Sequence, residues 1–258
     1  MEFSTGVTID NGTYTLRELV RGEHPEGLWM ATTAGGDKVW VTLRRLRADA
    51  QRTQLLDFDA PGIPRPLFIG APDFTDKRRE YYFSVVDAIP RGASLASLGP
   101  RSVRASIQLG IELCDVVASW ARSSNGMIFS GLHPETIYLD QDRYVGAVPR
   151  PHSLLGSQPD FYGSPNVSFD PPGYWGSVME SGDAVFTVGL LVWWGVCGVQ
   201  PYYAAGTDPE RNEFEDRRAL FTGPEALGAL LSRALLADRQ NRLGLAQLRG
   251  ELATLLDR

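Results

Sequence analysis

The pattern of the chain changes near residues 89–92, and this change limits its possible folds more than any other feature. Before it, short segments rich in β-branched and aromatic residues lie between turns, at Tyr14–Leu19, Leu28–Thr32 and Val39–Leu43. After it, apolar residues recur along Ser102–Ser123 with a helical period of about 3.6. Because strands come first and helices follow, the sequence predicts an α+β fold.

The same patterns place the remaining elements. A Gly-Gly-Asp turn at residues 35–37 is expected to close a hairpin. Further strands are expected at Arg65–Gly70 and Tyr81–Ala88, and a short region of strand and loop at 127–148. Further helices are expected at 183–198, 223–236 and 244–257. Repeated prolines exclude a helix from residues 149–174, which we expect to form a long loop. The sequence therefore predicts one bilobal domain, with a small β-rich lobe in residues 1–90 and a larger helical lobe in residues 91–258.

The composition is that of a globular protein. Of the 258 residues, 43% are hydrophobic and 22% are charged, which excludes a disordered or fibrous chain. The formal net charge of -6 argues against a nucleic-acid partner, because nucleic-acid backbones attract basic surfaces. The three histidines are far apart in the sequence and form no metal-ligand motif, so a zinc site is not expected.

Targeting signals and cysteine usage indicate the compartment. Met1–Gly12 has neither the basic start nor the apolar run of an export signal. The most hydrophobic stretch, Ala184–Val199, is shorter than the ~18 to 20 residues that span a bilayer. Cys114 and Cys197 lie in apolar helical patterns and are expected to be buried thiols. We therefore expect a cytoplasmic protein with no membrane insertion.

Two strings of residues, at 132–140 and 181–202, point to a known protein family. Leu132–Asp140 reads LHPETIYLD, which resembles the catalytic-loop string LKPENILLD of Hanks-type protein kinases, in particular of their bacterial members. Ser181–Tyr202 (SGDAVFTVGLLVWWGVCGVQPY) resembles the buried kinase helix that opens with an aspartate, contains a glycine and ends in Gly-x-x-Pro-aromatic. Six positions separate Asp183 from Gly189, where the family has five. The resemblance extends from about Tyr14 to Leu256 and implies a two-lobe protein-kinase-like fold.

With these anchors, other positions come into register with the family. Arg44 stands at the place of the phosphate-contacting lysine, Val86 at the gatekeeper place, and Asp87 at the start of the hinge. Pro171–Gly173 resembles the Ala-Pro-Glu that closes the kinase activation segment. Arg242 matches the arginine that pairs with that glutamate in kinases.

The residues that kinases use for phosphoryl transfer are missing from the aligned positions. Gly131 stands in place of the catalytic aspartate, Thr136 in place of the metal-holding asparagine, and Pro149 at the magnesium-binding aspartate. Arg44 is not a conservative replacement for the lysine, and the nucleotide-cradling loop at 22–27 contains a proline and two glutamates. Magnesium is held chiefly by carboxylate oxygens, and the aligned positions offer no carboxylate. Since the groups that transfer a phosphoryl group are also missing, we expect no catalytic residue, no metal and no cofactor.

Two positions keep an architectural role in this alignment. Tyr138 falls beneath the expected adenine site, and two interpretations remain open. Its ring crowds the nucleotide pocket, or it is an ordinary tyrosine packed in the core. Asp183 is expected to accept hydrogen bonds from the backbone of the former catalytic loop at 129–131.

The resemblance implies a pseudokinase, that is, a catalytically inactive kinase-like domain that acts as a protein-interaction or regulatory module. Three alternatives remain. The first is a sensor that binds nucleotide weakly and without metal, using Arg44 and the hinge at Asp87–Ile89. The second is a kinase-like transferase with a rearranged active site, and the third is a scaffold whose cleft is closed. Serines in the expected surface loop at 153–168 are candidates for phosphorylation by an active kinase.

Overall fold

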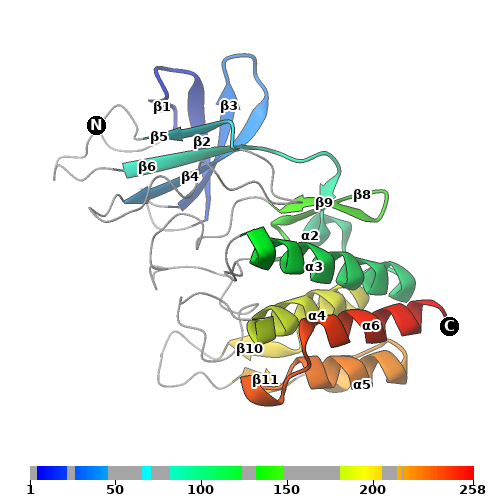
Figure 1. Cartoon of the computed structure of the whole chain (residues 1–258). Coiled ribbons are helices and arrows are strands. Elements are labelled where there is room, and N and C mark those ends of the chain that lie inside the picture. Colours follow the sequence, from blue (N-terminus) through cyan, green and yellow to red (C-terminus); the bar gives the residue numbers. More distant parts are fainter. Residues whose placement is uncertain are drawn as a thin grey trace.

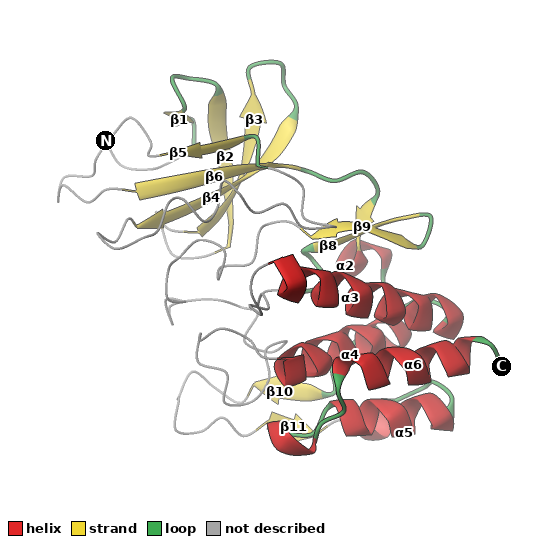
Figure 2. Ribbon diagram, viewed as in Figure 1, coloured by secondary structure: helices red, strands yellow, loops and turns green. Residues whose placement is uncertain are grey.

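The computed structural model shows a mixed α+β architecture. It describes residues 5–21, 27–45, 66–70, 82–123, 132–147, 181–204, 214–216 and 218–258. A six-stranded antiparallel sheet lies at one end of the molecule and the helices lie at the other (Figure 1). A small three-stranded sheet lies where these two parts meet (Figure 2). The expected α+β class is therefore confirmed, whereas the kinase-like architecture and the boundary at residues 90 and 91 remain predictions.

The six-stranded sheet is built from the first ninety residues in the order β1-β2-β3-β4-β6-β5, and every neighbouring pair is antiparallel. Its strands are β1 (Thr8–Ile9), β2 (Tyr14–Arg21), β3 (Gly27–Thr33), β4 (Lys38–Arg45), β5 (Phe68–Gly70) and β6 (Tyr82–Ala88). All five strands expected in this region are present. The strand expected from residue 65 begins only at Phe68.

The expected Gly-Gly-Asp turn closes the hairpin between β3 and β4. The Thr33 N–H donates to the Asp37 carbonyl at 2.9 Å, and the Gly36 N–H donates to the Thr33 carbonyl at 3.0 Å. Gly36 has a φ of 90°, a conformation that glycine adopts without steric cost. The turn therefore sets the register in which Ala31 lies opposite Val39.

One face of the sheet forms a compact apolar cluster. Alternate residues of β4 point into it, because successive side chains of a strand point to opposite faces. The buried members are Ile9, Tyr14, Leu16, Trp29, Ala31, Val39, Val41, Leu43 and Val86. We call this set the sheet core. All of its buried members come from strands β1–β4 and β6.

The rest of the described chain is mostly helical. Its helices are α2 (Leu95–Leu98), α3 (Val103–Ser123), α4 (Ser181–Cys197), α5 (Glu225–Ala234) and α6 (Leu245–Leu256), with 3-10 turns η3 (Arg218–Leu220) and η4 (Arg239–Asn241). Its strands are β7 (Ala93–Ser94), β8 (Ile137–Asp140) and β9 (Arg143–Ala147) in one sheet, and β10 (Tyr202–Ala204) with β11 (Phe214–Asp216) in another. The expected long helices are all present, with bounds that differ from the expected ones by at most two residues.

Helix α4 lies at the centre of a second apolar cluster, which we call the helical core. Every residue from Asp183 to Trp193 is buried. Trp120 of α3, Leu231 of α5 and Leu248 of α6 pack in the same cluster and are fully buried. Cys114 also belongs to it, and burial raises the pKa of its thiol to about 12. Among the described residues, no helix combines the length and apolar character needed to cross a membrane.

Several sequence predictions lie outside the described residues. These are Gly131, Pro149, residues 22–26 of the expected nucleotide loop, Pro171–Gly173, and the expected loop at 153–168.

Candidate functional site

The candidate site lies where the sheet meets the helical part, between β4 and β8. Trp40 of β4 donates a hydrogen bond from Nε1 to the hydroxyl oxygen of Tyr138 of β8, at 3.1 Å. The two residues are 98 positions apart in the sequence. Tyr138 is only 7% exposed, and Trp40 is half-buried. A direct side-chain contact therefore joins β4 of the six-stranded sheet to β8 of the three-stranded sheet.

Strand alternation separates Tyr138 from the helical core. Its neighbours Ile137 and Leu139 belong to that core, and they are 0% and 2% exposed. Tyr138 lies between them on the strand, so its side chain points to the opposite face. It belongs to neither apolar cluster. The ring is therefore buried outside both clusters, and both interpretations of Tyr138, a ring that crowds the nucleotide pocket and an ordinary packed tyrosine, stay predictions.

Burial also keeps Tyr138 in its neutral form. Loss of solvation raises the pKa of its hydroxyl, and the hydrogen bond from Trp40 lowers the pKa by a smaller amount. The net shift is upward. The hydroxyl is therefore protonated at neutral pH and accepts from the indole as a neutral group.

The register between β4 and β6 places Asp87, the expected start of a hinge, beside Trp40. Trp40 lies opposite Asp87, and Val41 lies opposite Val86. Val86, the expected gatekeeper residue, is fully buried in the sheet core. Asp87 is 1% exposed. Arg44 lies farther along β4, opposite Phe83, so the expected cleft positions on β4 and β6 are neighbours in one pair of strands.

Thr42 contributes a buried polar group to the same face of β4 as Trp40. It lies two residues after Trp40 and is 3% exposed. Its hydroxyl has no hydrogen-bond partner among the described residues. Because a buried polar group without a partner costs free energy, this hydroxyl is a point at which the site can accept a hydrogen bond from, or donate one to, a bound molecule.

Thr136 forms a tight turn just before β8. Its hydroxyl accepts a hydrogen bond from the His133 N–H and donates one to the His133 carbonyl, both at 3.0 Å. The Thr136 N–H also donates to that carbonyl, at 2.9 Å. The side chain at the expected metal-holding place is therefore bound to local backbone. His133 accepts at Nδ1 from the Glu135 N–H at 3.3 Å, so its ring also contacts this turn.

The connection from β6 to β7 comes close to the backbone of β8 at Gly92. Gly92 has a φ of 87°, and a side chain there would overlap the carbonyl oxygen of Leu139. The next two residues pair with β8, Ala93 with Leu139 and Ser94 with Tyr138. The chain that leaves the sheet is therefore pinned to the strand that carries Tyr138.

Asp183 lies at the start of α4 and pairs with two arginines. Its carboxylate accepts from Arg239 at 2.8 Å and from Arg242 at 3.2 Å. The side chains of Asp183 and Arg242 are 2% and 1% exposed. The Arg242 guanidinium also donates to the carbonyls of Ala237 and Gly182.

The described surroundings of Arg242 and Asp183 include groups that the alignment does not imply. Burial lowers the pKa of Arg242, and the Asp183 charge opposes that effect. The guanidinium lies 4.9 Å from the ring centroid of Phe186. Residues 129–131 and 171–173, to which the alignment had assigned these two side chains, are outside the described residues. The described partners instead join the start of α4 to the segment before α6.

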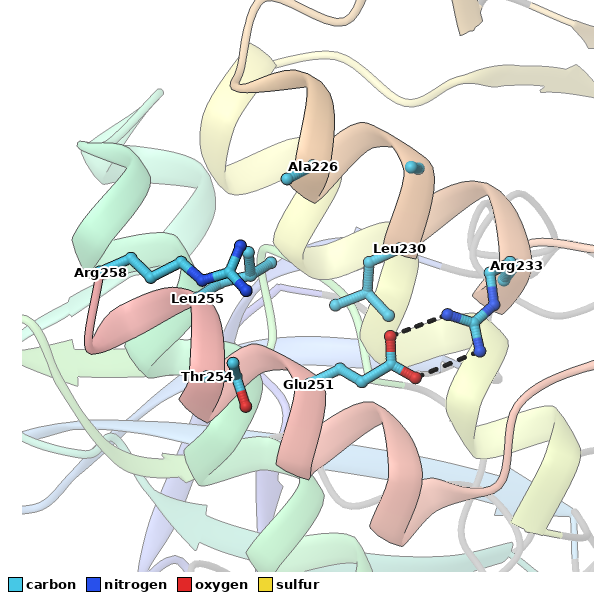
Figure 3. A pocket seen from close by; sticks show the side chains of 8 residues that line it. Ala226, Leu230, Arg233, Glu251, Thr254, Leu255 and Arg258 are labelled. Atoms are coloured by element: carbon cyan, nitrogen blue, oxygen red, sulfur yellow. Dashed lines mark hydrogen bonds and ion pairs between the residues drawn. The ribbon is translucent and has the colours of Figure 1, made fainter.

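A separate hollow of about 250 Å³ lies between α5 and α6 (Figure 3). Leu230 and Leu255 give it an apolar floor. The Arg233 guanidinium and the Glu251 carboxylate pair across one end through two hydrogen bonds, at 2.8 and 3.1 Å. None of the residues singled out by the sequence lines this hollow.

Trp40 is the functional candidate that the sequence did not single out. The available signal was its place in β4, between Val39 and Val41 of the sheet core, which puts it on the other face. Among the described residues, no group of three or more His, Cys, Asp or Glu side chains is placed to hold a metal ion. The chain matches no protein-family model and no curated protein. The kinase resemblance thus remains a prediction from residues 132–140 and 181–202.

Proposed function

We propose that the chain is a two-lobe, protein-kinase-like domain without phosphoryl-transfer activity, which acts as a protein-interaction or regulatory module. Strands β1–β6 would form the N-terminal lobe, and the residues from β7 onward would form the C-terminal lobe. The mixed α+β architecture is compatible with this division (Figure 2). The partner is expected to be a protein, because the net charge of -6 disfavours nucleic acid.

The hydrogen bond between Trp40 and Tyr138 is the observation that carries this proposal. The family alignment puts the adenine of ATP between the strand of Trp40 and the strand of Tyr138. The Trp40 Nε1 and the Tyr138 hydroxyl oxygen lie 3.1 Å apart. These two aromatic side chains leave less room there for a purine ring. Thr136, at the metal-holding place, is bound to the backbone of His133. These contacts support a binding role in preference to catalysis.

Thermal unfolding with ATP tests the proposal. A ligand that binds only the folded state stabilises it by about 2.7 kcal/mol at 100 times its Kd. For a domain of this size, 1 kcal/mol shifts the Tm by about 2–4 °C. We expect millimolar ATP to leave the Tm unchanged, both with magnesium and with a chelator. A rise that requires magnesium, together with phosphate transfer to a protein substrate, would contradict the proposal.

The second candidate is a sensor that binds nucleotide without metal. It is favoured by the Thr42 hydroxyl, which is buried and has no partner among the described residues. A ligand that pairs with this hydroxyl would remove a cost of roughly 1–3 kcal/mol. The chelator arm of the same experiment tests this candidate, because a sensor of this kind raises the Tm equally with magnesium and with chelator.

A further inference from the structure

We propose that Trp40 and Tyr138 form a latch that holds the sheet against the helical part and keeps the face of β4 covered. This inference concerns the regulation of the site described above, and it rests on the proposed function for the identity of that site. The latch is the hydrogen bond from the Trp40 indole to the Tyr138 hydroxyl, together with the burial of the Tyr138 ring.

The two parts that the latch joins have separate cores. The buried members of the sheet core all precede residue 87, and those of the helical core all follow residue 94. No buried residue belongs to both clusters. Among the described elements, strands β1–β6 pack mainly on one another and the helices pack mainly on one another. Two bodies that share little apolar surface are expected to move relative to each other.

The chain between the two parts is short and contains a suitable pivot. Only residues 89–92 separate β6 from β7. Gly92 is held against β8 by its close approach to the Leu139 carbonyl, whereas β6 is paired in the sheet. A rotation of the sheet would therefore be absorbed by a few backbone dihedrals at 89–92, as is usual for a hinge.

The latch lies outside both apolar cores. Trp40 is on the face of β4 that points away from the sheet core, and Tyr138 is on the face of β8 that points away from the helical core. Their hydrogen bond therefore contributes to the closed arrangement without contributing to either core. A single neutral hydrogen bond changes such an equilibrium by roughly 2- to 10-fold. A partner protein that binds the uncovered face of β4 can shift the equilibrium by this factor.

Thr42 offers a direct reporter of opening. It shares a face with Trp40 and is 3% exposed, so a thiol at this position is protected while the latch is closed. We would introduce Thr42→Cys together with Cys197→Ser, and follow the rate of labelling with a thiol reagent. Cys114 remains as a buried thiol of raised pKa and contributes little to the rate. When opening is faster than labelling, the rate is proportional to the open population.

Tyr138→Phe keeps the ring and removes the acceptor hydroxyl. We expect it to raise the labelling rate roughly 2- to 10-fold, the effect of one lost hydrogen bond. Trp40→Phe should raise the rate as well, and the double variant should label no faster than the faster single variant, because both remove the same bond. Tyr14→Phe is the matched control, since Tyr14 is also 7% exposed but lies in the sheet core.

The proposal is overturned if Tyr138→Phe labels at the rate of Tyr14→Phe, or if the effects of the two latch variants add. A rise caused by global unfolding is recognised because the buried Cys114 thiol would then label in parallel. No nucleotide is present in this experiment. The ATP experiment and the labelling experiment can therefore fail independently, which separates the latch from the proposed function.

Discussion

Gly92 shows how a single residue positions the site. It has a positive φ of 87°, and a side chain there would overlap the Leu139 carbonyl of β8. We expect Gly92→Ala to lower the free energy of unfolding by about 1–3 kcal/mol or more, because both the backbone conformation and the contact with β8 are strained. Urea unfolding measures this loss.

Gly12→Ala is the control for this prediction. Gly12 has the same φ of 87°, but a side chain there would meet no atom within 4 Å. The difference between the two variants therefore isolates the contact with Leu139. Equal losses of stability would mean that Gly92 is required for its backbone conformation alone.

At the scale of elements, Asp183 and Arg242 join α4 to the segment before α6. Both side chains are at least 98% buried, and Arg242→Met removes one of the two arginines that pair with the Asp183 carboxylate while Arg239 remains. Because hydrogen bonds to a charged group are lost, we expect Arg242→Met to lower the free energy of unfolding by about 1.5–3 kcal/mol. Arg242→Lys should also be destabilising, since an ammonium group cannot reproduce the planar fork that bonds Asp183 and the carbonyls.

Arg233→Met is the matched control for Arg242→Met. Arg233 also bonds a carboxylate, that of Glu251, but its side chain is 48% exposed. Exposed pairs contribute only about 0–1 kcal/mol. Both variants are compared by urea unfolding. Similar losses for the two arginines would show that burial of Arg242 has little energetic effect.

The elements differ in how well their sequences predicted them. The helical period of Ser102–Ser123 predicted α3 to within one residue, because a stripe of apolar residues is a local signal. The hairpin of β8 and β9 was expected only as a strand and loop. Its turn residues Gln141 and Asp142 have φ values of 46° and 67°, and neither is the glycine that usually marks such a turn.

At the scale of the whole molecule, the two separate cores predict that a substitution in one core changes the free energy of unfolding independently of a substitution in the other. Ile9 belongs to the sheet core and Ile137 to the helical core, and both are fully buried. We expect Ile9→Val and Ile137→Val each to cost about 0.5–1.5 kcal/mol. Their effects in the double variant should add to within about 0.3–0.5 kcal/mol, as for distant sites that share no neighbours.

Urea unfolding of the two single variants and the double variant measures this additivity. If the free-energy changes depart from additivity by more than that margin, the two cores are energetically coupled although they share no buried residue. A change of the m-value in one single variant would instead indicate that the two parts unfold in separate steps.

The sequence by itself determined the order of strands and helices and the turn at residues 35–37. These follow from local periods and from residue identities. Only the tertiary structure decided that Trp40 meets Tyr138, 98 residues away, and that Asp183 pairs with Arg242, 59 residues away. A period shows which face of an element is apolar, but the partner of a polar or aromatic side chain on the other face depends on how distant elements pack.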